Sequence, residues 1–170
     1  PLKIGVFGSS AGGEVATGTA LNYPTFDAEN NSTDDPLAGI SSRPDFVGLL
    51  YTGPSDITRD PTKPIPADVP PAFITCPSYG DDRHTGWSMD YYLAMLERDV
   101  PNIEMHLYAI GSHGGGLKDR RGTSMGTWQD RYIDWFRDLG FLDPPDTPTK
   151  AAADTPVSYT HLTLPTNREV

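Results

Sequence analysis

A short apolar run that leads through a glycine-rich turn into a helix constrains the fold of this chain more than any other feature. Residues 4–7 are mostly apolar, and small residues together with Val15 make residues 14–21 typical of a helix that packs closely on a sheet. Residues 8–12 read GSSAG, which fits the pattern G-x-S-x-G in the strand–turn–helix context that this pattern requires. The sequence therefore predicts that Ser10 lies on a tight, strained turn, where Gly8 and Gly12 prevent steric clashes.

Further apolar segments alternate with helical patterns along the chain. The predicted elements are strands at residues 46–51, 72–76 and 104–108, and helices at residues 87–98 and 128–139. Gly140 is expected to cap the last helix. Residues 24–44 are polar and are expected to form a loop with room for a short helical turn. The alternation of strands and helices predicts an α/β fold with a parallel sheet and flanking helices.

A serine nucleophile needs a histidine that takes its proton and an acid that orients this histidine. After a G-x-S-x-G turn the chain order is serine, acid, histidine. Asp81 and Asp82 follow the third predicted strand, and His113 follows the fourth within a glycine-rich loop. Because parallel strands end at one edge of a sheet, we expect one of these acids and His113 to meet Ser10 there. The backbone N–H of Ala11, at the helix start, is the predicted donor to an oxyanion.

Each of these residues also has an ordinary structural interpretation. A glycine-rich turn is often only structural, an isolated loop histidine such as His113 is usually solvated, and the acid pair is typical of a solvated turn. His106 lies inside a predicted strand and is expected to pack there, half-exposed. His84 is a weaker candidate base than His113 because it lies beside the acid pair in the sequence.

Nucleotide, nucleic-acid and membrane binding are disfavoured. Gly8 and Gly13 have the spacing of a phosphate-binding loop, but Glu14 occupies the position where that loop needs a lysine. A net charge of −10 argues against surfaces that bind DNA, RNA or anionic membranes. No stretch reaches the roughly 18 consecutive apolar residues of a membrane-spanning helix. Cys76, the only cysteine, allows neither an internal disulfide nor a cysteine-based zinc site.

Several segments together resemble the esterases of the α/β-hydrolase superfamily, a group that includes acetyl esterases, xylan acetylesterases and bacterial feruloyl esterases. The resemblance runs over residues 2–142. It is carried by five segments in the order of the family: IGVFGSSAGG at residues 4–13, SSRPDFVGLLY at 41–51, PPAFITCPSYGDD at 70–82, VPNIEMHLYAIGSHGGGL at 100–117 and TWQDRYIDWFRDLGFL at 127–142.

This resemblance implies a serine carboxylesterase that works without a metal or a cofactor. It implies a catalytic triad of Ser10, Asp81 and His113, an acyl-enzyme intermediate, and removal of short acetyl-type groups from a small-molecule or carbohydrate ester. Asp81 is preferred to Asp82 because the family usually places its acid three residues before the position that His84 holds here.

Three other interpretations stay open. A serine peptidase of the prolyl-oligopeptidase type would share the fold and the order of the triad. A noncatalytic relative would keep the fold without the activity. Trp87, near the acid loop, could stack on a sugar or simply pack. Oligomeric state and localisation stay open as well.

The resemblance also predicts how the chain is organised. Residues 1–142 are expected to be the C-terminal portion of a longer hydrolase domain, whose N-terminal strands and His-Gly-Gly loop, the usual second oxyanion donor, are not in this chain. Residues 143–156, rich in Pro, Thr, Ala and Asp, are expected to be a linker or disordered. Residues 157–170 begin VSYTHLTLPT, which looks like a translated sequencing adapter, so we give His161 no functional weight.

Overall fold

The protein is built on one sheet of four parallel strands. The computed structural model describes residues 3–30, 34–117 and 122–154, so the adapter-like segment lies outside the described residues. The strands are β1 (Gly5–Ser9), β2 (Phe46–Leu50), β3 (Ala72–Pro77) and β4 (Glu104–Tyr108). They are hydrogen-bonded in the order β1-β2-β3-β4, and every neighbouring pair is parallel. The predicted parallel α/β sheet is therefore confirmed.

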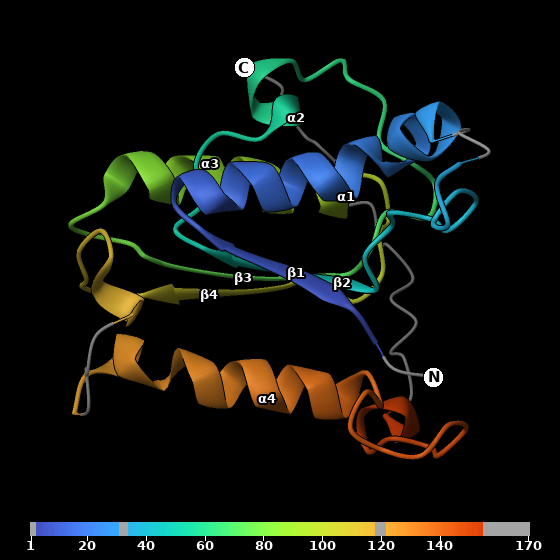
Figure 1. Ribbon diagram of the computed structural model, residues 1–170. Helices are drawn as coiled ribbons and strands as arrows, with labels where there is room; N and C mark the ends of the chain where they lie inside the picture. The colour runs from blue at the N-terminus through green and yellow to red at the C-terminus, as the bar shows by residue number, and fades with distance from the viewer. Residues whose placement is uncertain (1–2, 31–33, 118–121, 155–170) are drawn as a thin grey trace, which may run out of the picture.

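Helices cover both faces of this sheet (Figure 1). The helices on one face are α1 (Ala11–Glu29), α2 (Asp56–Arg59) and α3 (Asp82–Leu96), and α4 (Trp128–Asp138) lies on the other. Three short 3₁₀ helices complete the described structure: η1 (Gly115–Leu117), η2 (Ser124–Thr127) and η3 (Ala151–Ala153). The crossing helices explain why strands that follow one another in the chain can all run in the same direction.

The sheet separates two hydrophobic cores. Ile74 of β3 belongs to the core beneath α1 and α3, together with Ala20 and Tyr91 of these helices. Its neighbour Phe73 belongs to the core beneath α4, together with Trp135. Both strand residues are fully buried, because successive side chains point to opposite faces of a sheet that is covered on both sides.

Two helices extend beyond their predicted bounds. Helix α1 continues through Pro24 to Glu29, within the segment expected to be a loop. The Asp27 carboxylate in this last part accepts the Ser42 backbone N–H at 2.6 Å, so tertiary contacts offset the backbone hydrogen bond that proline cannot make. Helix α3 begins at Asp82 rather than near residue 87.

No helix among the described residues is both long enough and apolar enough to cross a membrane.

The C-terminal part of the described structure agrees more closely with the elements predicted from the sequence. Helix α4 has nearly its predicted bounds, and Gly140 follows it with a φ of 68°, the left-handed conformation of a glycine cap. Residues 143–154 form turns and η3, and Thr149 of this segment lines a hollow together with Trp135. The domain boundary at residue 142 stays a prediction.

The turn between β1 and α1 yields a matched pair of stability predictions. A Cβ at Gly8 would lie 2.1 Å from the Gly12 carbonyl oxygen, whereas a Cβ at Gly12 would meet nothing within 4 Å. We expect Gly8→Ala to lower the free energy of unfolding by about 1–3 kcal/mol, the usual cost of overpacking. Gly12→Ala should change it by less than about 1 kcal/mol. Urea denaturation of both variants checks this, and equal effects would contradict the close approach.

Candidate active site

Ser10 lies on the tight turn between β1 and α1. Its backbone has φ 53° and ψ −124°, a conformation that is strained for any residue with a Cβ. The Ser10 N–H donates to the Leu50 carbonyl at 3.0 Å, and the Ser10 carbonyl accepts the Gly13 and Gly53 N–H groups, each at 2.9 Å. Three backbone hydrogen bonds thus hold the strained residue between two strands and a helix, and they fix the direction of its side chain.

The loops after β3 and β4 are bonded to each other at the same end of the sheet, on the left in Figure 1. The Ser78 N–H donates to the Tyr108 carbonyl at 2.6 Å, and the Gly111 N–H donates to the Tyr79 carbonyl at 3.1 Å. Gly80 has a φ of 98°, and a Cβ at this position would lie 2.1 Å from the Gly111 carbonyl oxygen. Glycine is therefore required for this approach, which brings the acid loop beside the histidine loop.

Asp81 stands at the N-terminus of α3, yet its carboxylate does not cap that helix. Its Oδ2 atom lies 2.9 Å from His113 Nδ1, and its Oδ1 atom lies 2.6 Å from His84 Nδ1. The Asp81 side chain is only 8% exposed. A carboxylate so far removed from water needs such hydrogen bonds to stabilise its charge.

His113 joins Asp81 to Ser10. Its Nε2 atom lies 2.8 Å from Ser10 Oγ, and its ring contacts the ring of Tyr51 edge-on at 5.0 Å between centroids. Burial raises the pKa of Tyr51, so this phenol stays neutral beside the imidazole. The following loop is tied to α4, because Trp128 Nε1 donates to the Gly116 carbonyl at 2.7 Å.

The structure therefore brings Ser10, His113 and Asp81 into one hydrogen-bonded row. Asp82 lies one residue further along, as the first residue of α3, with an exposed side chain. Ala11 begins α1 directly after Ser10. A hydroxyl, an imidazole and a shielded carboxylate in this order can turn the hydroxyl into a nucleophile.

Sequence reasoning missed the place of His84. This residue was the weaker candidate base, and in the structure it binds the other oxygen of Asp81, with its ring 4.1 Å from the ring of His113. The spacing of three residues from Asp81, one turn of a helix, was the signal that could have found it. His106 is half-buried as predicted, with its ring 5.3 Å from Phe73.

Asp81, His84 and His113 are also the one group in the described part of the chain whose ligand atoms could reach a shared metal ion, since these atoms lie within 4.8 Å of one another. The two imidazole rings are tilted by 31° to each other, and each Nδ1 lies within hydrogen-bonding distance of a different oxygen of the Asp81 carboxylate. Hydrogen bonds to the carboxylate explain this geometry better than two ring nitrogens that converge on one ion.

Burial raises the pKa of Cys76 to about 11, so its thiol is no competing nucleophile.

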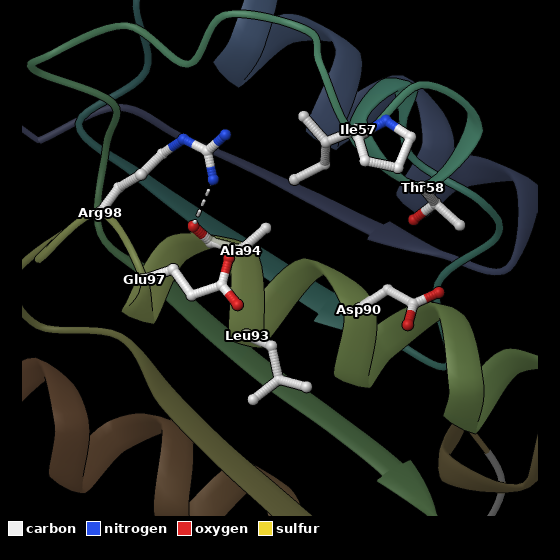
Figure 2. A pocket seen from close by; sticks show the side chains of 8 residues that line it. Ile57, Thr58, Asp90, Leu93, Ala94, Glu97 and Arg98 are labelled. Atoms are coloured by element: carbon white, nitrogen blue, oxygen red, sulfur yellow. Dashed lines mark hydrogen bonds between the residues drawn. The ribbon is translucent and has the colours of Figure 1, made fainter.

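A hollow between α2 and α3 lies apart from this row. Ile57 and Thr58 of α2 lie opposite Asp90 and Ala94 of α3 and Glu97, the residue that follows α3 (Figure 2). The lining contains no serine, cysteine or histidine. This hollow therefore offers none of the side chains that form the row at Ser10.

Comparison with known proteins identifies the fold. No protein-family model matches the sequence, and no curated protein matches it either. An acetyl ester-xyloside bifunctional hydrolase from Caldicellulosiruptor lactoaceticus has a similar structure, with a TM-score of 0.67 and 24% identity over 81% of this chain and 57% of that one. A carboxylesterase from Lactobacillus plantarum has a TM-score of 0.59 and 19% identity over 81% of this chain and 59% of its own.

An α/β-hydrolase enzyme from a Medee basin deep-sea metagenome is similar as well, with a TM-score of 0.54 and 20% identity over 78% of this chain and 52% of that one. The chain thus spans between 52% and 59% of the length of these three proteins. Together with the parallel sheet and its flanking helices, these likenesses show that the chain has part of the α/β-hydrolase fold.

Proposed function

We propose that the chain carries the catalytic residues of a serine carboxylic ester hydrolase, with Ser10 as nucleophile, His113 as general base and Asp81 as the orienting acid. The observation that carries this proposal is the continuous row from Ser10 Oγ to His113 Nε2 at 2.8 Å and from His113 Nδ1 to Asp81 Oδ2 at 2.9 Å. The strained backbone of Ser10 supports it, because strain of this kind persists mainly at functional sites.

The proposed reaction has two halves. His113 Nε2 removes the proton of Ser10 as Oγ attacks the ester carbonyl, and the imidazolium then gives this proton to the departing alcohol. The Ser10 acyl ester that remains is attacked by a water molecule, whose proton passes to His113 and then back to Ser10 as the free acid leaves. Asp81 stabilises the imidazolium in both halves, since its buried carboxylate faces Nδ1.

The Ala11 N–H is the proposed first donor to the oxyanion of each tetrahedral intermediate. Ala11 is the first residue of α1, and the first amides of a helix have no acceptor within the helix. The positive end of the helix dipole adds to this stabilisation. By the resemblance to α/β-hydrolase esterases, we propose that a loop outside this chain provides a second donor in the complete protein.

The proposed substrate is a carbohydrate that carries short, acetyl-type acyl groups. Support comes from the likeness to a structure described as an acetyl ester-xyloside hydrolase. Trp87 lies one helical turn beyond His84 with its ring 5.1 Å from that ring, and Arg83 lies over it at 5.9 Å. Because His84 and Arg83 cover part of the Trp87 ring, only the remainder of its aromatic surface is available to a sugar ring.

Loss of the Ser10 hydroxyl should abolish hydrolysis. We expect Ser10→Ala in the complete protein to lower kcat on 4-nitrophenyl acetate by at least about 10³-fold, because removal of a triad member leaves only the binding and oxyanion contributions. Measurement of the initial rates of both proteins checks this. Retention of most of the activity by the variant would rule out a Ser10 acyl-enzyme.

Substitution of the two neighbouring acids, Asp81 and Asp82, should have very different effects on kcat. Asp81→Asn should lower kcat by about 10⁴-fold, because an amide in place of the carboxylate favours the wrong imidazole tautomer. Asp82→Asn, the matched control, changes an exposed side chain and should keep kcat within about twofold. Comparable losses in the two variants would contradict the assignment of Asp81 as the acid.

Substrate preference separates the esterase from its rivals. We expect the complete protein to release acetate from acetylated xylose faster than it hydrolyses 4-nitrophenyl decanoate, and to leave a prolyl peptide substrate intact. Measurement of kcat/KM on all three gives the ranking. A preference for the peptide would instead indicate a peptidase of the prolyl-oligopeptidase type, and inactivity on all three would indicate a noncatalytic relative.

A further inference from the structure

A second histidine shares the carboxylate that orients His113. His84 Nδ1 lies 2.6 Å from Asp81 Oδ1, and His113 Nδ1 lies 2.9 Å from Asp81 Oδ2. An ionised carboxylate can only accept hydrogen bonds, so both imidazoles meet it with an Nδ1–H group. With 8% of the Asp81 side chain and 20% of the His84 side chain exposed, this hydrogen bond is largely shielded from water.

The Asp81 carboxylate could instead cap its own helix, because Asp81 stands at the N-terminus of α3. An aspartate at this position normally turns its carboxylate toward the first amides of its own helix. Asp81 makes no such capping bond. The terminal torsion of an aspartate is broad, so something must hold the carboxylate in its present orientation. The Nδ1–H of His84 is placed to do this.

We propose that His84 is a positioning residue, which fixes the rotation of the Asp81 carboxylate so that Oδ2 stays directed at His113. This inference rests on the proposed function of Ser10, His113 and Asp81. It assigns His84 no contact with the substrate.

The surroundings of His84 suit this role. Within α3, Trp87 follows His84 by three residues, so these two side chains lie on one face of the helix, and Asp81 is the residue that precedes the helix. The Trp87 ring meets the His84 ring edge-on at 5.1 Å. The centroid of the His84 ring also lies 4.1 Å from that of the His113 ring, so the two imidazoles are in contact.

Two substitutions at His84 separate the hydrogen bond from the packing. His84→Leu keeps apolar bulk against Trp87 but removes the donor, whereas His84→Asn keeps an N–H close to the position of Nδ1. In the complete protein, we expect His84→Leu to lower kcat by about 10- to 100-fold, the effect of one lost hydrogen bond to a charged group, with KM within about twofold. His84→Asn should recover most of this loss.

His106 offers a matched control. It is half-buried, its Nε2 lies 2.6 Å from Glu104 Oε1, and its ring also packs on an aromatic side chain, but it lies within β4. His106→Leu should keep kcat within about twofold. An equal loss of kcat in His106→Leu and His84→Leu would show a general effect of losing a histidine–carboxylate pair, and would overturn the positioning role.

Proton NMR gives a readout that does not depend on turnover. The low-field resonance of the His113 Nδ1–H, identified by its loss in His113→Gln, should be preserved in His84→Asn and shifted or broadened in His84→Leu. An unchanged resonance together with an unchanged kcat in His84→Leu would overturn the inference. If Ser10→Ala keeps full activity, the proposed function fails instead, and the resonance alone still decides whether His84 orients Asp81.

Discussion

The common direction of the four strands is the constraint on which the site depends. Because all strands run the same way, the residues that follow β1, β3 and β4 emerge at one end of the sheet. Ser10 and His113 are 103 positions apart in the sequence, yet their side chains lie 2.8 Å apart. An antiparallel arrangement of any one of these strands would carry its loop to the opposite end. The site therefore also depends on the helices that cover both faces, because parallel strands need such crossing connections.

Close contacts between backbone segments fix the positions of the loops that carry Ser10, Asp81 and His113. Glycine at positions 8 and 80 lets chain segments meet where a Cβ would lie 2.1 Å from a carbonyl oxygen. Hydrogen bonds between the loops after β3 and β4 then fix Asp81 and His113 relative to each other. The Trp128 indole anchors the end of the histidine loop to the helix on the far face. Contacts on both sides of the sheet thus support one row of three side chains.

The sequence predicted the elements whose pattern is local. The strands, the turn at Ser10 and the glycine cap at Gly140 all depend on residues within a few positions, and the structure has them where they were expected. The extension of α1 past Pro24 was not predictable in this way, because a contact from Asp27 to Ser42 holds that part of the helix. The contact between His84 and Asp81 has a local signal, their spacing of three residues, but His84 was compared with His113 only as a candidate base and not as a partner of Asp81. Only the folded chain shows one carboxylate between two imidazoles.

We propose that the geometry makes Ser10 a nucleophile, and covalent labelling shows which serine reacts. The protein would be treated with a fluorophosphonate, digested and mapped by mass spectrometry. We expect a single adduct on the peptide that contains Ser10, and no adduct on that peptide when His113 is replaced by alanine. An adduct on a different serine, or labelling of Ser10 that is just as fast without His113, would contradict it.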